Sequence, residues 1–192
     1  MSNDLLTDTQ REVQSLARDF AQAEIAPYAA EWSERHEVPL AVLRKMGDLG
    51  LLGVVVPEEL GGAGLDATSL ALVVEEVARA DAGTSTAIAV QNGLVASPIL
   101  RAGTRAQQEE WLPRIAAGDI FGAYALTEPD AGSDTASLRT TATARDGGWA
   151  VSGSKMWITN GGFADLFVVF ARTGEAGAKG ISAGIVVVCD GR

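Results

Sequence analysis

The spacing of hydrophobic residues along the first two-thirds of the chain predicts helices. Thr7-Asp-Thr-Gln10 has the form of a capping box, and apolar residues follow it at helical spacing. We expect this first helix to end near Pro27 or somewhat beyond it. Pro39 fits the first turn of a second, short helix, which Gly47 and Gly50 should stop.

The next segment breaks the helical pattern and then resumes it. The glycines between Gly53 and Gly64 permit tight turns, so we expect a connecting loop there. From Leu70 to Val77 the apolar positions i, i+3, i+4 and i+7 predict a helix with one buried face. An apolar segment over 84–100 should be bent or ended by Pro98, and Thr104-Arg-Ala-Gln107 is a second capping box.

After Gly118 the pattern changes to that of β-strands. Asp146-Gly147-Gly148 is a typical hairpin turn between two of them. The expected strands cover residues 121–126, 138–145, 149–152, 165–172 and 181–188. The pattern predicts an α+β chain, with an all-α helical domain over 1–121 and an antiparallel β domain over 122–192.

The β part looks unfinished in sequence. It offers about five strands in its 71 residues and ends directly after a strongly apolar one. Complete domains usually protect an apolar strand edge from aggregation. We therefore expect an incomplete β domain, in a chain that is the N-terminal part of a longer protein.

Charge and composition exclude several classes of protein. The net charge is −10, which argues against nucleic acid as a partner, because nucleic acid selects for Lys and Arg. No apolar run approaches the length of a membrane span. The N-terminus lacks the features of a signal peptide, and the single cysteine, Cys189, suits a reducing cytoplasm. With one histidine, His36, no cluster has the spacing of metal ligands.

The segment Tyr124-Ala-Leu-Thr-Glu-Pro-Asp-Ala-Gly-Ser-Asp134 is the first candidate for chemistry. A strand runs into Pro129, which stops ladder pairing, and a loop with Gly132 and Ser133 follows. Successive backbone N–H groups beside a serine hydroxyl can bind an anion. An ordinary strand-to-loop turn uses the same residue types, so this segment alone leaves both interpretations open.

The segment Gly153-Ser-Lys-Met-Trp-Ile-Thr-Asn160 is the second candidate. Trp157 could lie against an aromatic ring system, with Thr159 bonded to a ring heteroatom. A strand tryptophan in the core is the alternative. The stretch from Gly148 to Lys155 nearly spells a phosphate-binding P-loop, but Ser and Lys are transposed and it reads as strand. Gly161-Gly162 opens no dinucleotide fingerprint.

Together, in this order, the two segments resemble the paired flavin-binding motifs of the acyl-CoA dehydrogenase family. Gly50-Leu-Leu-Gly-Val-Val-Val-Pro57 and Gly61-Gly-Ala-Gly64 are similar to that family as well. The resemblance covers the whole chain and implies a helical N-terminal domain, a β-barrel middle domain and a C-terminal helical domain that is absent here. It also implies FAD as cofactor and an acyl-CoA thioester as substrate, in fatty acid metabolism.

The resemblance assigns roles to particular residues. Tyr124, Ala125, Leu126 and Thr127 are expected along the flavin edge, and Trp157, Ile158 and Thr159 on the opposite side of the ring. Gly132 and Ser133 are expected at the FAD pyrophosphate, with Ser133 also near the CoA thioester. The resemblance further places Ile88, Gln91 and Leu94 beside the acyl tail.

The same resemblance implies α,β-desaturation, in which a glutamate removes the α-proton and the hydride passes to flavin N5. The family takes that glutamate mostly from its C-terminal domain, so no catalytic residue is assigned here. Glu128 is expected to be structural. An electron-transfer flavoprotein is implied as electron acceptor, and a homo-oligomer for the full-length protein. An acyl-CoA oxidase, a monooxygenase-like enzyme and a non-catalytic binding module stay open as alternatives.

Overall fold

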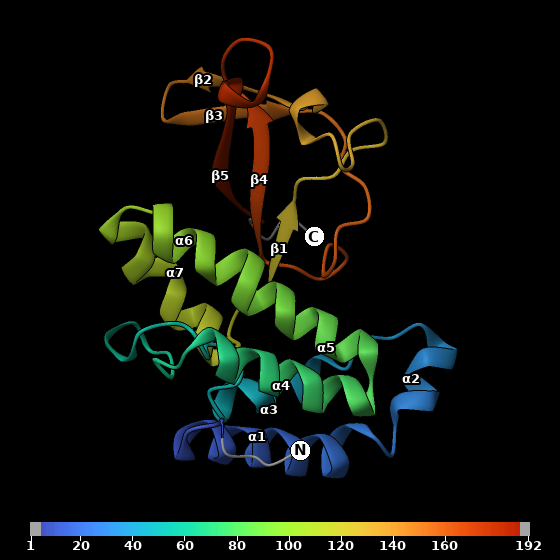
Figure 1. Cartoon of the computed structure of the whole chain (residues 1–192). Coiled ribbons are helices and arrows are strands. Elements are labelled where there is room, and N and C mark those ends of the chain that lie inside the picture. Colours follow the sequence, from blue (N-terminus) through green and yellow to red (C-terminus); the bar gives the residue numbers. More distant parts are fainter. Residues whose placement is uncertain (1–4, 189–192) are drawn as a thin grey trace. The chain divides into compact units, whose positions relative to one another are not determined.

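The computed structural model describes residues 5–188 and divides into two compact units, Met1–Ile120 and Phe121–Arg192. The first unit is helical and the second is built on a β-sheet (Figure 1). The predicted α+β class, with helices first and strands after them, is therefore confirmed. Among the described residues, no helix is both long enough and apolar enough to cross a membrane.

The first unit consists of α-helices joined by short helical turns of other types. Its α-helices are α1 (Asp8–Phe20), α2 (Ala29–Arg35), α3 (Leu40–Asp48), α4 (Ala67–Ala80), α5 (Ala82–Ala89), α6 (Ser97–Ala102) and α7 (Arg105–Ala117). Wider π-helical turns cover Ala21–Ile25 and Val90–Ala96, and a 3₁₀ turn covers Glu58–Leu60. The glycine-rich stretch before α4 contains only this 3₁₀ turn, so it is the connecting loop that the sequence predicts.

Both predicted capping boxes are present. At α1 the Thr7 hydroxyl accepts from the backbone N–H of Gln10 at 3.2 Å, and the Gln10 side chain accepts from the N–H of Thr7 at 3.0 Å. Thr104 and Gln107 repeat the arrangement at α7. Each cap satisfies backbone donors that the first helical turn leaves free, and is worth about 1 kcal/mol.

The buried face of α4 differs slightly from the predicted one. Leu70 and Val74 are only half-buried, whereas Ser69 and Glu76 are buried. The Glu76 carboxylate accepts from Arg18 at 2.8 Å and also from Gln14 and Arg79. The Arg18 guanidinium holds the pKa of Glu76 below its usual range. Because these donors satisfy a buried charge, the helix can turn a polar residue inward where the apolar pattern predicts only hydrophobic ones.

The apolar segment after α4 follows one helical path from α5 to α6. The π-helical turn lies directly before α6, whose second residue is Pro98, and the path ends at Gly103. Asn92 is fully buried in this turn. Its Oδ1 accepts from Val54 N–H at 2.8 Å, and its Nδ2 donates to the carbonyls of Leu51 and Ile88. Asn92 therefore fastens the glycine-rich loop to the helices.

The second unit holds a five-stranded mixed sheet. Its strands are β1 (Gly122–Ala125), β2 (Thr141–Arg145), β3 (Gly148–Ser152), β4 (Leu166–Arg172) and β5 (Ile181–Val187). The predicted hairpin is confirmed, because β2 and β3 pair antiparallel around the Asp146–Gly147 turn. β5 pairs antiparallel with the whole of β4.

The expectation of an all-antiparallel sheet is wrong, because β1 lies parallel to β4. β2 also joins β4 in parallel, at the single pair Thr141 and Arg172. Parallel neighbours need a long crossover connection, and the residues between β1 and β4, which include the β2–β3 hairpin, provide one. The strand pattern could not show this, because it is the same for both kinds of pairing.

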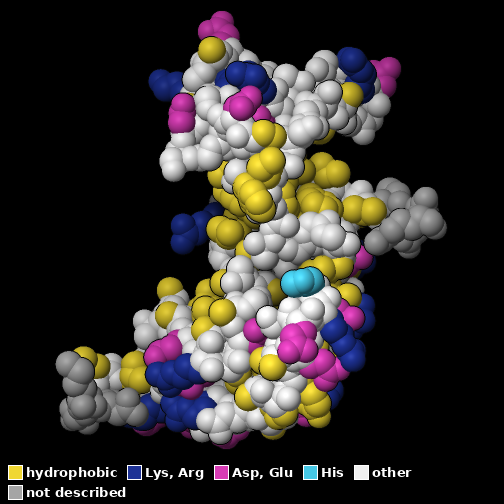
Figure 2. Space-filling view, turned by 90° about the vertical axis from the view of Figure 1, so that its right-hand side faces the viewer, with side chains coloured by type: hydrophobic (Ala, Val, Ile, Leu, Met, Phe, Trp, Pro, Cys, Tyr) yellow, Lys and Arg dark blue, Asp and Glu magenta, His cyan; other side chains and the backbone are white. Residues whose placement is uncertain are grey.

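The sheet is not closed within residues 5–188, and one apolar surface stays open. A cleft of about 410 Å³ is lined by residues of β3, β4 and β5, among them Trp149, Val169 and Ile185. Hydrophobic side chains reach the surface of this unit in Figure 2, and Trp149 is 61% exposed. The described part of this unit is thus an open mixed sheet. Cys189 lies outside the described residues.

Replacing Asn92 by Ala should lower the free energy of unfolding by about 2–4 kcal/mol, because a buried N–H and two buried carbonyls lose their partner. Urea unfolding followed by circular dichroism measures the change. Gln22→Ala is the matched control, since Gln22 lies exposed in the other π-helical turn and its change should stay within about 0.5 kcal/mol. Equal stability of the Asn92→Ala variant and the unmodified protein would contradict the anchoring role.

Candidate functional site

The first motif lies in a loop that leaves the sheet and returns to the same strand edge. Ala125, the last residue of β1, pairs with Val169, and Thr141, the first of β2, pairs with Arg172. The fifteen residues 126–140, here called the motif loop, therefore span only three positions along β4. A loop of this length between such close ends must fold back on itself.

Local hydrogen bonds fold the motif loop into two turns. Glu128 and Ala131 exchange backbone hydrogen bonds of 3.0 and 3.2 Å across a tight turn with Pro129 at its first corner. A 3₁₀ turn follows at Thr135–Ser137, where the Ser137 hydroxyl donates to the Asp134 carbonyl at 2.9 Å. Residues 132–134 are left exposed at the tip between the two turns.

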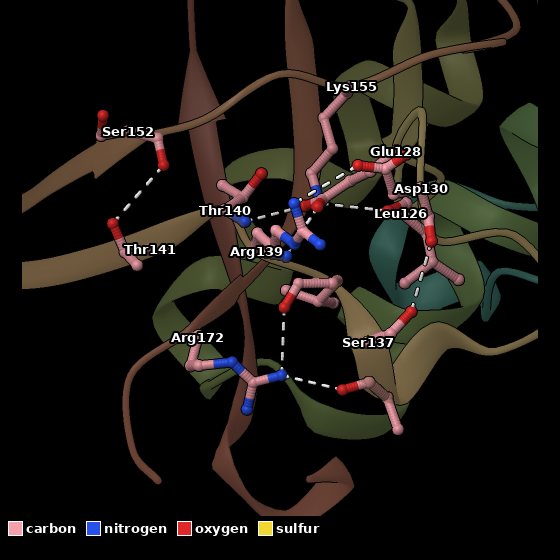
Figure 3. Close-up of polar contacts among 12 residues, drawn as sticks. Leu126, Glu128, Asp130, Ser137, Arg139, Thr140, Thr141, Ser152, Lys155 and Arg172 are labelled. Atoms are coloured by element: carbon pink, nitrogen blue, oxygen red, sulfur yellow. Dashed lines mark hydrogen bonds and ion pairs between the residues drawn. The ribbon is translucent and has the colours of Figure 1, made fainter. Parts of the chain in front are cut away.

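The Glu128 carboxylate closes the motif loop (Figure 3). It accepts from the backbone N–H groups of Arg139 at 2.6 Å and Thr140 at 2.9 Å, and from Lys155 Nζ at 2.9 Å. Its side chain is 6% exposed. Burial by itself would raise the pKa of Glu128, but these hydrogen bonds outweigh burial and lower it to about 2. The structural role expected for Glu128 agrees with these contacts.

Arg172 fastens the motif loop from the β4 side. Its Nη2 donates to the carbonyls of Ala136 and Leu138 at 2.9 and 3.0 Å (Figure 3), and its Nη1 donates to those of Glu175 and Gly177. A guanidinium presents several donors in a fixed plane, which lets one side chain hold two loops. Arg172 could not be identified from the sequence, because a lone arginine at a strand end carries no motif.

The second motif, residues 153–160, runs along the outer edge of β1 and is called here the cover segment. Met156 N–H donates to the Thr127 carbonyl at 2.9 Å, near one end of β1. Asn160 Nδ2 donates to the Gly122 carbonyl at 3.0 Å, at the other end. These anchors bring the predicted residues 157–159 beside 124–127.

Trp157 protrudes from the cover segment in a strained conformation. Its φ is 57°, in the left-handed region that a bulky residue rarely adopts, and it is 85% exposed. The alternative of a core tryptophan is therefore excluded within this unit. Such a backbone costs of order 1–3 kcal/mol and persists only where neighbouring contacts enforce it. Here the neighbouring anchors at Met156 and Asn160 enforce it.

The outer edge of β1 has backbone groups that face the cover segment. Phe121 directs its carbonyl to Leu166 of β4, whereas Gly122 directs its own to Asn160. Backbone groups alternate along a strand with parallel pairing, so Tyr124 and Leu126 face the same side as Gly122. The Tyr124 ring packs on Phe170 at 4.8 Å between centroids. The backbone of Tyr124, and not its side chain, is therefore the part of this residue that faces the outer edge.

The remaining predicted residues lie in different places. Gly132 and Ser133 are exposed at the tip of the motif loop, and an added Cβ at Gly132 would meet no atom within 4 Å. In the helical unit, Ile88 and Gln91 are buried, with 0% and 1% exposure, and Leu94 is 43% exposed. Gln91 donates to the carbonyls of Ile115 and Ile120. Their place beside an acyl tail stays a prediction.

This arrangement suits one kind of ligand. An exposed indole beside a strand edge with outward N–H and C=O groups can hold a flat heteroaromatic ring that has donors and acceptors on its rim. The open tip at Gly132 leaves room for a further part of the ligand. Among residues 5–188, no cluster of His, Cys, Asp and Glu could hold a metal ion.

The low pKa of Glu128 predicts an acid-labile motif loop. A carboxyl group with a pKa of about 2 in the folded state and 4.5 unfolded stabilises the fold above pH 4.5 and loses this effect as the pH falls toward 2. Glu128→Gln should cost about 3 kcal/mol at neutral pH, and the difference should shrink across this window. Urea unfolding at several pH values measures it. Glu175→Gln, at an exposed carboxylate, is the control; a difference independent of pH would contradict the assignment.

Comparison with known proteins gives the family. The model of the acyl-CoA dehydrogenase N-terminal domain matches residues 7–119, and that of the acyl-CoA dehydrogenase middle domain matches residues 123–190. The human mitochondrial short-chain specific acyl-CoA dehydrogenase is 44% identical over 182 residues, which are 94% of this chain and 44% of that protein. The chain spans about half the length of the curated relatives it matches.

Solved structures agree with the sequence relatives. A chain in the structure of the electron transferring flavoprotein of Acidaminococcus fermentans has a TM-score of 0.93 at 40% identity, over 98% of this chain and 50% of that one. The acyl-CoA dehydrogenase of Bacillus anthracis, complexed with FAD, has a TM-score of 0.87 at 37% identity, over 97% of this chain and 32% of that one. Matches to both domain models, in order along the chain, show that it belongs to the acyl-CoA dehydrogenase family.

Proposed function

We propose that this chain is the flavin-holding part of an FAD-dependent acyl-CoA dehydrogenase that desaturates an acyl-CoA thioester between Cα and Cβ. The observation that carries the proposal is the outer edge of β1, where the cover segment fixes an exposed Trp157 beside outward backbone groups. Family membership and the FAD complex of the Bacillus anthracis relative support it.

The residues fit FAD in two places. Tyr124, Ala125, Leu126 and Thr127 would lie along the flavin edge, and Trp157, Ile158 and Thr159 would cover the other side of the ring. Gly132 and Ser133 would approach the pyrophosphate, because the loop tip is exposed and Gly132 has no side chain to block the approach. Within residues 5–188 neither residue makes a hydrogen bond, so their N–H groups suit an anion. Ser133 would also lie near the thioester.

FAD, when bound, would accept the hydride from the acyl β-carbon. Removal of the α-proton needs a carboxylate with access to the substrate. Glu128 does not fit that role, because three donors occupy its oxygens and its side chain is 6% exposed. In keeping with the family resemblance, which takes the base mostly from a C-terminal domain, we place the catalytic base outside the described residues and expect residues 1–192 alone to be inactive.

The proposal extends to the partners of the full-length protein. An electron-transfer flavoprotein would reoxidise the flavin, in keeping with the similarity to a chain in the Acidaminococcus fermentans structure. A homo-oligomer in the cytoplasm is proposed for the full-length form. The human relative is named for short-chain substrates, which makes butyryl-CoA a suitable first probe.

The complete protein should be purified yellow, and butyryl-CoA should bleach its flavin absorbance under anaerobic conditions. Residues 1–192 alone should not support this bleaching, because the base is placed elsewhere. Absorbance at the flavin maximum measures both. A colourless product that retains no added FAD would contradict the enzyme assignment, and rapid hydrogen peroxide formation in air would indicate an oxidase instead.

The variant Trp157→Gly should lower the affinity for FAD without lowering the stability of the flavin-free protein. Glycine relieves the strain at a φ of 57°, so the flavin-free protein should keep its stability or gain about 1 kcal/mol. Loss of the indole should weaken FAD binding about tenfold, which corresponds to about 1.4 kcal/mol. Thermal unfolding and FAD titration measure the two effects.

Trp149→Ala is the matched control, because Trp149 is also exposed but lies on β3. Its FAD affinity should equal that of the unmodified protein. Unchanged FAD affinity in the Trp157→Gly variant would remove this tryptophan from the proposed site.

A further inference from the structure

Lys155 connects the two motifs through its side chain. Its Nζ donates to the Leu126 carbonyl at 3.0 Å and to Glu128 Oε1 at 2.9 Å, both in the motif loop (Figure 3). Lys155 itself belongs to the cover segment, two residues before Trp157. One ammonium group thus bonds the segment that carries the tryptophan to the segment that is proposed to line the flavin edge.

Burial distinguishes this ion pair from the other one that the motif loop makes. The side chains of Lys155 and Glu128 are 13% and 6% exposed, whereas those of Arg139 and Asp130 are 80% and 71% exposed. Exposed pairs contribute little, because water and salt compete for both charges. A buried pair with additional hydrogen bonds is held in one geometry, and losing either partner leaves an unmatched charge in the interior.

The bond to the Leu126 carbonyl also has a directional effect. A peptide unit is planar, so holding the oxygen of Leu126 fixes the orientation of the Thr127 N–H on the opposite side of the same plane. Met156 N–H holds the Thr127 carbonyl at 2.9 Å, which fixes the next peptide plane as well. The backbone of Thr127 is therefore oriented by two consecutive residues of the cover segment.

We propose that the Glu128–Lys155 ion pair is a positioning element, which sets the separation of the motif loop and the cover segment and thereby the affinity for FAD. The inference rests on the proposed function, because it takes these two segments as the walls of a flavin site. Neither residue touches the flavin in this account; both act through Leu126, Thr127 and Trp157.

The test uses the complete protein, freed of flavin and titrated with FAD. Lys155→Met should weaken FAD binding about tenfold or more, because methionine donates to neither oxygen. It should also change the visible circular dichroism of the bound flavin at saturation. Lys155→Arg keeps a donor for both acceptors and should restore affinity to within about threefold.

Lys179→Met is the matched control, since Lys179 is an exposed lysine of the same unit. It should leave both readouts unchanged. If Lys155→Met fails to fold, the double variant Glu128→Gln with Lys155→Met removes both charges and leaves none unpaired. That variant should still bind FAD about tenfold more weakly, because the donor to Leu126 is gone.

The outcomes separate the two proposals. If the unmodified protein binds no FAD, the proposed function fails and the inference fails with it. If the unmodified protein binds FAD, and Lys155→Met binds it equally well with the same flavin dichroism, the positioning role alone is overturned. A lowered melting temperature with unchanged FAD affinity would likewise show that the pair only stabilises the fold.

Discussion

The closure of the motif loop by a buried carboxylate is the interaction on which the rest of the site depends. β1 and β2 occupy one edge of β4, and fifteen residues connect points three positions apart. Backbone ordering over such a length is costly in entropy, and within the loop only Ala131 and Leu138 bury an apolar side chain to offset it. The order comes from hydrogen bonds that the Glu128 carboxylate accepts from the closing end of the loop, and from those that Arg172 donates to loop carbonyls.

The same framework supports a strained and exposed residue. Trp157 combines a left-handed backbone with an indole that the unit does not bury. Both features oppose stability in the free protein, and both become reasonable if a ligand covers the ring. The neighbouring contacts of Lys155, Met156 and Asn160 restrict the conformations open to this residue. The site is thus preorganised, so less conformational entropy remains to be lost when a ligand binds.

Local features of the fold could be predicted from the sequence, and long-range ones could not. The capping boxes at Thr7 and Thr104 and the Asp146–Gly147 hairpin depend on neighbours within a few residues, and all are present. The parallel pairing of β1 with β4 joins residues more than forty positions apart, and the hydrophobic pattern of the sequence does not indicate it. The burial of Glu76 could not be predicted either, because the arginine that satisfies its charge, Arg18, lies on another helix.

The site shows the same division. The motifs identify residues such as Gly132 and Trp157, whose roles at the flavin stay a proposal. The residues that hold those motifs in place, Lys155 and Arg172, were not predicted. Lys155 has no role of its own in the second motif or in the rejected P-loop as read from sequence, because its partners lie 27 and 29 positions away. A positioning residue is recognised by what it contacts, and contacts at that separation emerge only with the fold.

Amide hydrogen exchange tests the central claim, that the motif loop is ordered before any ligand binds. In the flavin-free protein, the N–H groups of Arg139 and Thr140 should be as protected as those of β4, because they are bonded to a buried carboxylate. Those of Gly132 and Ser133 should exchange rapidly and become protected when FAD is added. Rapid exchange at Arg139 and Thr140 without flavin would contradict the account, as would no response to FAD at the loop tip.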